Sequence, residues 1–211
     1  SKAALRVGYF SGTQADNAAT GNNSIGLGRD CQAQGSDAVA LGQASLAQAT
    51  NSFAANGAGV AAGATFGVAI GSGASIAAAG TDAVAIGSNA TITQPSGIAI
   101  GNTAASSGAG AVAIGTASSA TASNALALMG GSATVNDSVA IGSGVSATTG
   151  AGAFASGRAV GASTLQATGI GSRTHGYVGS GKILEATGNG AIATGYAAGI
   201  SAFSNVQATG N

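Results

Sequence analysis

The stretch 82–115 contains three nearly identical phrases, Asp82-Ala-Val-Ala-Ile-Gly87, Ser96-Gly-Ile-Ala-Ile-Gly101 and Gly110-Ala-Val-Ala-Ile-Gly115. Their closing glycines are evenly spaced along the chain. A short fixed period is typical of a solenoid, in which one repeat cannot bury its own apolar face and must stack on its neighbours. The stretch therefore predicts that the chain is built from stacked coils.

The same phrase can be followed along most of the chain when its closing residue is used as a marker. The markers are Gly28, Gly42, Asn56, Gly71, Gly87, Gly101, Gly115, Met129, Gly142, Gly157 and Gly171, about 14 residues apart on average. A strand–helix–strand unit needs about 30 residues and does not fit this period. Two strands of about five residues and two tight turns do fit. The sequence thus predicts an all-β parallel solenoid with coils of about 14 residues over residues 20–171.

Turn residues recur five positions before the marker. They are Asn23, Asp37, Asn51, Asp82, Asn124 and Asp137. Asn and Asp tolerate left-handed backbone and hydrogen-bond within their own turns. We therefore expect one corner of each coil at these positions and the other corner at or near the marker glycine.

The two strands of each coil differ in composition. The first strand is apolar at consecutive positions, as in Val84-Ala-Ile86, whereas the second alternates or is polar, as in Ser118-Ser-Ala-Thr-Ala122. Consecutive apolar residues are typical of a strand that is buried on both faces. Only one face of the first sheet can point into the solenoid, so its other face predicts a partner. The simplest partner is another copy in a closed symmetric assembly, whose number of copies these residues leave open.

The residues predicted to face this partner belong to the first strands. They are Val84, Ile86, Ile98, Ile100, Val112, Ile114, Val139 and Ile141. Phe53 and Phe154 occupy the valine position of the same strand, and we expect them in the core.

The phrases Asp82-Ala-Val-Ala-Ile-Gly87 and Asp137-Ser-Val-Ala-Ile-Gly142 are each followed by a strand rich in Ser, Ala and Thr. Together they resemble the head repeat of bacterial trimeric autotransporter adhesins, over about residues 20–171. The resemblance implies a left-handed parallel β-roll in which three chains pack side by side as a homotrimer. It also implies adhesion, and phage fibre or capsid-decoration proteins are expected to borrow the same roll.

Composition argues against several classes of function. The 211 residues include 38 glycines, only 6% of the residues are charged, and six basic residues balance six acidic ones. A neutral and sparsely charged chain gives no electrostatic basis for binding nucleic acid. No uninterrupted apolar run approaches the roughly 18 residues that cross a bilayer, so direct membrane insertion is not expected.

Catalytic, metal and cofactor chemistry have little basis in the sequence. His175 is the only histidine and Cys31 the only cysteine, so a triad or a metal cluster would depend on single residues. Glycine motifs here connect strand to strand, which does not predict a phosphate-binding loop at the start of a helix. We expect no enzyme activity, no cofactor and no metal.

The ends of the chain depart from the repeat. Residues 1–19 are interpreted as an N-terminal cap or docking segment. After Gly171 the next comparable glycine is Gly195, so residues 172–211 are predicted to form an irregular excursion and a C-terminal closing coil. Loops on rigid scaffolds often carry binding. The candidate recognition or attachment residues of this excursion are Arg173, His175, Tyr177, Lys182 and Glu185, with Tyr196 as a further contact candidate.

Two hypotheses of function follow, both non-enzymatic. The first is a bacteriophage virion protein, a fibre or capsid-decorating trimer attached to a larger particle at the virion surface. Ser1-Lys2 is typical of a start after removal of an initiator Met, and a free Cys31 suits assembly in a reducing compartment. The alternative is the head of an adhesin on a stalk at the bacterial outer-membrane surface, which binds a host matrix or cell-surface ligand.

Overall fold

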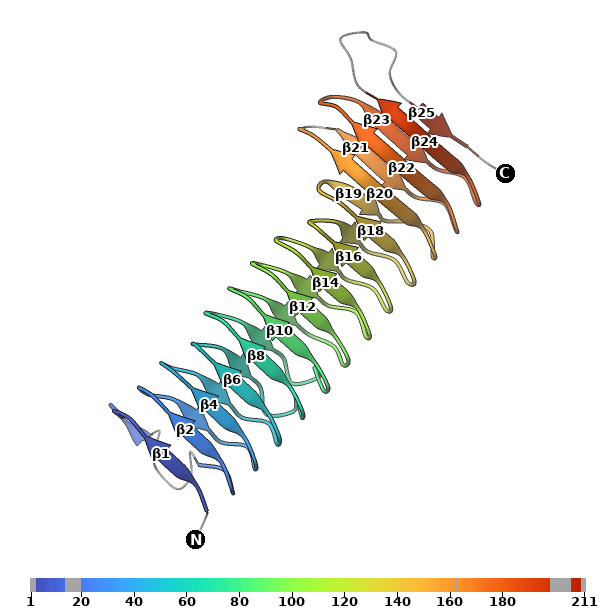
Figure 1. Ribbon diagram of the computed structural model, residues 1–211. Helices are drawn as coiled ribbons and strands as arrows, with labels where there is room; N and C mark the ends of the chain where they lie inside the picture. Colours follow the sequence, from blue (N-terminus) through green and yellow to red (C-terminus); the bar gives the residue numbers. More distant parts are fainter. Residues whose placement is uncertain (1–2, 14–19, 162, 198–205, 210–211) are drawn as a thin grey trace. The chain divides into compact units, whose positions relative to one another are not determined.

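The structure is a computed structural model that describes residues 3–13, 20–161, 163–197 and 206–209 (Figure 1). The chain divides into two compact units, residues 1–107 (unit 1) and 108–211 (unit 2). In each unit, successive coils contribute one strand to each of two parallel sheets. This arrangement confirms the predicted all-β solenoid.

Unit 1 stacks its strands in sequence order. Its first sheet contains β1 (Leu5–Val7), β2 (Ile25–Leu27), β4 (Val39–Leu41), β6 (Phe53–Ala55), β8 (Val68–Ile70), β10 (Val84–Ile86) and β12 (Ile98–Ile100). Its second sheet contains β3 (Gln32–Ala33), β5 (Leu46–Ala47), β7 (Gly59–Val60), β9 (Ser75–Ile76), β11 (Thr91–Ile92) and β13 (Ala105–Ser106). From β2 to β12 the register partners in successive coils, such as Val84 and Ile98, are separated by close to the predicted period.

Unit 2 has the same plan with a change near its end. Its first sheet contains β14 (Val112–Ile114), β16 (Leu126–Leu128), β18 (Val139–Ile141), β20 (Phe154–Ala159), β22 (Arg173–Val178) and β24 (Ile192–Ala197). Its second sheet contains β15 (Ser119–Ala120), β17 (Ser132–Ala133), β19 (Val145–Ala147), β21 (Thr164–Ala167), β23 (Ile183–Ala186) and β25 (Val206–Ala208). Up to β20 the register keeps close to the predicted period. The next two steps are longer, because Phe154 pairs with Arg173 and Arg173 pairs with Ile192.

These longer coils correct the predicted irregular excursion. Residues 173–178 and 183–186 form regular strands β22 and β23, in register with β20 and β21. The closing glycines of the long coils are Gly157, Gly176 and Gly195, which pair along the first sheet. Gly171 has a φ of +61° and lies instead at the corner before β22. Gly171 follows Gly157 by one step of the shorter period, although the register partner of Gly157 is Gly176. The sequence spacing alone therefore did not reveal that the coils become longer after Gly157.

The N-terminal segment also joins the solenoid. Strand β1 pairs in parallel with β2, and Arg6 takes the inward position of the strand. Its Nη2 atom donates hydrogen bonds to the carbonyl oxygen of Ala33 (2.7 Å) and to Ser24 Oγ (3.1 Å). A Cβ atom on Gly26 would lie 2.9 Å from Arg6 Nη1, so glycine leaves room for this side chain. Arg6 thus covers the interior of the first coils with a polar group, whereas residues 1–2 and 14–19 lie outside the described residues.

Left-handed backbone at the corners confirms the predicted turns. The φ angles lie between +53° and +58° at Asn23, Asp37, Asn51, Asp82, Asn124 and Asp137. At the opposite corner, Gly87 has a φ of +129°, and a Cβ atom there would lie 2.5 Å from the carbonyl oxygen of Gly101. Asn56 and Met129 replace the marker glycine with φ angles of +59° and +56°.

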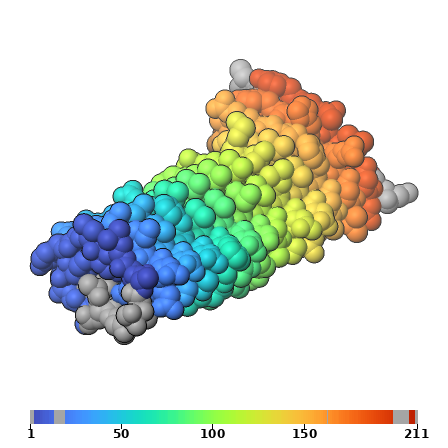
Figure 2. All heavy atoms as spheres, turned by 60° about the horizontal axis from the view of Figure 1, so that its bottom comes forward, coloured from blue at the N-terminus to red at the C-terminus, as the bar shows by residue number. Residues whose placement is uncertain are grey.

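The core of the coils is thin and built mainly from small side chains. The central alanines of the first strands, such as Ala85 and Ala99, are fully buried, and the second sheet contributes Ile76 and Ile92 from the other side. In Figure 2 the successive coils of unit 1 form consecutive bands from blue to green, as expected for a solenoid whose repeats contact their neighbours. The side chains of the second sheet fill most of the interior, so the inward positions of the first strands hold alanine and have no space for a larger side chain.

Within a single chain, the first strands are fully buried on their inner face only. Val84 and Ile86 flank the buried Ala85 and remain half-buried, because alternate side chains of a strand point to opposite faces. Phe53 and Phe154, expected in the core, are half-buried at the same outward position. On the first strands, large apolar side chains thus lie outside the coil and alanines lie inside, whereas the second sheet contributes larger side chains such as Ile76 and Ile92 to the interior.

Candidate functional site

The outward face of the first sheet carries two apolar columns in each unit, here called the outward columns. In unit 1 they consist of Leu5, Ile25, Val39, Phe53, Val68, Val84 and Ile98, and of Val7, Leu27, Leu41, Ala55, Ile70, Ile86 and Ile100. In unit 2 they consist of Val112, Leu126, Val139 and Phe154, and of Ile114, Leu128 and Ile141. The structure places all eight residues predicted to face a partner in these columns, half-buried or, for Ile114, 39% exposed.

The outward face gains polar residues in the last three coils of unit 2, beside the apolar Phe154 and the 61% exposed Ile192. One column continues as Ser156, His175 and Thr194, and a new column is formed by Arg158, Tyr177 and Tyr196. The new column exists because β20, β22 and β24 are each twice as long as β18. We call these six residues and Arg173 the polar face. The longer coils therefore add outward surface and change its chemistry.

Two side-chain contacts order the polar face. Ser156 Oγ lies 2.8 Å from His175 Nδ1, and Ser156 is only 9% exposed while His175 is exposed. The rings of Tyr177 and Tyr196 stack with their centroids 5.0 Å apart and their planes at 15°. Stacked aromatic rings restrict each other's orientation. The two columns are thus partly fixed before any ligand binds.

Arg173 lies beside a hollow at the edge of the polar face. The hollow has a volume of about 340 Å³ and is lined by Val139, Gly152, Phe154 and Arg173. Its volume is at the lower end of the range for ligand pockets, about 300 to 1,000 Å³. A guanidinium beside apolar walls can bind a carboxylate or another planar anion in a bidentate manner.

The structure brings three of the five predicted recognition residues together. Arg173, His175 and Tyr177 alternate on the outward face of β22. Lys182 and Glu185 instead lie before and within β23 of the second sheet, where Gln207 Nε2 donates a hydrogen bond to Glu185 Oε2 at 3.2 Å. Sequence reasoning missed Ser156, Arg158 and Thr194. The even but longer spacing of Gly157, Gly176 and Gly195 is the signal that would have aligned these residues.

The groups with catalytic potential are sparse in the described part of the chain. His175 contacts Ser156, but no carboxylate among the described residues is hydrogen-bonded to His175, so only two groups of a triad are present there. Cys31 is fully buried, and this burial raises the pKa of its thiol, which keeps the sulfur protonated at neutral pH. The described ranges contain no group of three His, Cys, Asp or Glu side chains that could hold a metal ion.

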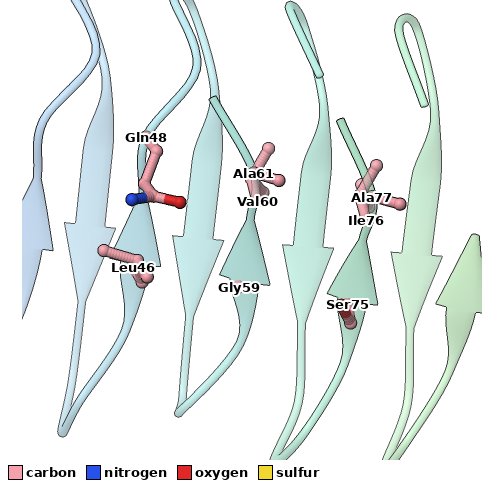
Figure 3. Close-up of a pocket in the computed structure, with 8 residues that line it drawn as sticks. All are labelled: Leu46, Gln48, Gly59, Val60, Ala61, Ser75, Ile76 and Ala77. Carbon is pink, nitrogen blue, oxygen red and sulfur yellow. The ribbon is translucent and has the colours of Figure 1, made fainter. Parts of the chain in front are cut away.

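A second hollow lies on the second sheet of unit 1 (Figure 3). It has a volume of about 230 Å³ and is lined by Leu46, Gln48, Gly59, Val60, Ala61, Ser75, Ile76 and Ala77. It exists because Gly59 has no side chain, and a Cβ atom there would have no neighbour within 4 Å. The lining is uncharged and the volume is below the range of typical ligand pockets, so the polar face is the better candidate site.

No helix among the residues that the structure describes combines the length and the hydropathy needed to cross a bilayer. No protein-family model matches this chain, and no curated protein matches it significantly.

Proposed function

We propose that this chain is a non-enzymatic structural and adhesive surface module that works as a homotrimer. The outward columns carry this proposal. In unit 1, every outward residue of the described first strands is apolar, from Leu5 to Ile100. A contiguous apolar face of this kind marks an interaction surface in a water-soluble protein.

The energy available from this face is sufficient for assembly only if the columns act together. Burying a half-exposed Val or Ile side chain contributes roughly 1 kcal/mol, at about 25 cal/mol per Å². The two columns of unit 1 together therefore contribute on the order of 10 kcal/mol, which is comparable with the cost of association, roughly 4–15 kcal/mol. Isolated contacts would not offset that cost, so we infer side-by-side packing along the whole column.

We infer that three copies form this packing. A closed symmetric assembly gives each copy the same environment and prevents open-ended growth. The likeness of Asp137-Ser-Val-Ala-Ile-Gly142 to the head repeat of trimeric adhesins supports three copies and a left-handed coil. The stabilisation would come from backbone hydrogen bonds along each stack and from apolar packing between chains.

The module is proposed to sit at the virion surface of a bacteriophage, as a fibre or decoration trimer attached to a larger particle. The free and buried thiol of Cys31 supports assembly in a reducing compartment. The alternative, an adhesin head on a stalk at the outer-membrane surface, is supported by the repeat phrase alone.

The location of this chain distinguishes a phage particle from an outer-membrane adhesin as its carrier. Mass spectrometry of purified virus particles and of outer-membrane fractions would detect peptides of this chain in one of them. We expect the peptides in the particles, at a copy number divisible by three. Enrichment in the outer-membrane fraction would move the module to the cell surface, and recovery in neither fraction would contradict a surface module.

A further inference from the structure

We infer that the polar face of unit 2 binds an acidic oligosaccharide, a short chain of sugar rings that carry carboxylate groups. The inference rests on the proposed adhesive function and names the class of its ligand. Four observations carry it: the end of the outward columns, the exposed tyrosine, the two guanidinium groups, and the neutral polar side chains between them.

The outward columns end where the polar face begins. The position of Ile141 in its column is taken by Ser156 and then His175. The position of Phe154 is taken by Arg173 and then by the exposed Ile192. Burial of the Arg173 charge against an apolar face is unfavourable unless an anion is paired with it. Arg173 therefore interrupts the apolar column and separates Ile192 from it, which leaves the polar face for a different partner.

Tyr196 provides an exposed aromatic platform. Its side chain is 70% exposed, and β24 is the last strand of the first sheet in the described structure. Tyr177 stacks on one side of the ring, so the opposite side is not covered by a further first-sheet strand of the described residues. A flat ring with an apolar face and a hydroxyl tip matches a sugar ring, whose C–H bonds pack on the face while its hydroxyls reach the tip.

Two arginines give the polar face a positive charge. Arg158 is the register partner of Tyr177, and Arg173 lies four residues before Tyr177 on the same strand. Strand geometry places the Cα atoms of the two arginines about 14 Å apart. The outward positions of β20, β22 and β24 hold no Asp or Glu in the described residues. Guanidinium groups bind carboxylates in a bidentate manner, so one ligand that reaches both must span several sugar rings.

The remaining groups suit hydroxyls better than phosphates. His175 Nδ1 is hydrogen-bonded to Ser156 Oγ, so Nε2 of the exposed ring is the nitrogen that can contact a ligand. Thr194 follows His175 in the same column and adds a hydroxyl group. A nucleic acid would require many phosphate contacts, but the face offers two guanidinium groups and the chain has a net charge of zero. The chemistry therefore favours a hydroxyl-rich ligand with few charges.

The test is isothermal titration calorimetry of the full chain with tetramers of galacturonic acid and of mannuronic acid. The matched ligand control is the methyl-esterified galacturonate tetramer, which has the same rings without the charges. We expect saturable binding of at least one acidic tetramer and at least tenfold weaker binding of the ester. Arg158→Gln, Arg173→Gln and Tyr196→Ala should each weaken binding at least fivefold. Lys182→Gln removes the same charge from the second-sheet side and should leave binding unchanged.

Several results would overturn the inference. These are binding of neither acidic tetramer, equal binding of the ester, an equal loss in Lys182→Gln, or tighter binding of a single-stranded oligothymidylate of similar length. Circular dichroism of each variant separates a lost contact from a lost fold. Sedimentation of the same samples separates the two proposals: a monomer that binds the tetramer contradicts only the homotrimer, and a trimer that does not bind it contradicts only this inference.

Discussion

Val84 and Ile98 are register partners on β10 and β12, and their side chains continue one outward column while the neighbouring Ala85 and Ala99 are fully buried. The usual arrangement of a β-protein, with large apolar side chains inside, is thus reversed on this sheet. The reversal has a simple cause, since two sheets joined by tight corners leave room only for alanine opposite the side chains of the second sheet. A continuous row of large apolar side chains on the outside of a coil indicates that a partner protein covers it.

A charge in an outward column should separate the chains without unfolding them. We expect Ile98→Glu to weaken association at least 100-fold, because an unpaired carboxylate would enter an apolar interface. The matched control is Thr91→Glu, at an exposed position of the second sheet. Sedimentation velocity over a range of concentrations measures the effect. Identical sedimentation of the two variants would show that the columns do not mediate assembly.

The corner glycines should be far less tolerant than the strand glycine Gly59. We expect Gly87→Ala to destabilise the protein by about 1–3 kcal/mol, because its φ is +129° and the new Cβ would meet the Gly101 carbonyl. Gly59→Ala meets no atom within 4 Å and should be neutral or stabilise by about 0.4–1 kcal/mol. Thermal unfolding followed by circular dichroism compares the two. A larger loss in Gly59→Ala would contradict the corner geometry.

The alanine interior should resist larger side chains. Ala99 is fully buried between the two sheets, and Ala99→Leu should destabilise by about 1–3 kcal/mol or more, because the added atoms have no cavity to fill. Ala78→Leu, at an exposed position, should change stability by less than about 0.5 kcal/mol. Urea unfolding of both variants measures the difference, and equal midpoints would mean that the interior is not closely packed.

Asp30 should make one contact of the N-terminal segment depend on pH. Its carboxylate accepts hydrogen bonds from Ser11 N (2.6 Å) and Ser11 Oγ (2.9 Å), and these bonds lower the pKa of Asp30. A lowered pKa means that the stabilisation is complete above the unfolded value of about 3.9 and is lost as the pH falls through the folded value. Hydrogen exchange at the Ser11 amide should therefore be slowed more at pH 6 than at pH 2, after correction for intrinsic rates.

The matched variant for this contact is Asp30→Asn, which keeps the shape and removes the charge. Its Ser11 amide should exchange with little dependence on pH beyond the intrinsic rate. Equal protection of the Ser11 amide at both pH values in the unchanged chain would contradict the role given to the Asp30 carboxylate.

Much of the fold could be predicted because its signals are local. The bounds predicted for the first strand at Val84–Ile86 agree with the structure, and Asp82 marks its corner because only a few residue types accept a left-handed backbone. The direction of the side chains could not be predicted in the same way. Three consecutive apolar residues do not show which face is outside, and the answer depends on the width of the interior.

The candidate site could be predicted only in part, because the alignment of its residues depends on the longer period of the last coils. Arg173, His175 and Tyr177 could be predicted as contact residues because charged and aromatic residues are rare in this chain. Ser156 and Arg158 belong to the coil that starts with Phe154, which the shorter period treats as an ordinary repeat. Their alignment with the next coils requires the longer step, which becomes visible only in the pairing of β20 with β22.

The mass of the assembly in solution distinguishes a homotrimer from a single chain. Sedimentation equilibrium of the full chain at micromolar concentration, with circular dichroism of the same sample, gives both mass and fold. A homotrimer would appear as a β-rich species of three times the chain mass of 19.2 kDa that persists on dilution. A folded, stable species of 19.2 kDa would contradict it, because the outward columns would then stand in water without a partner.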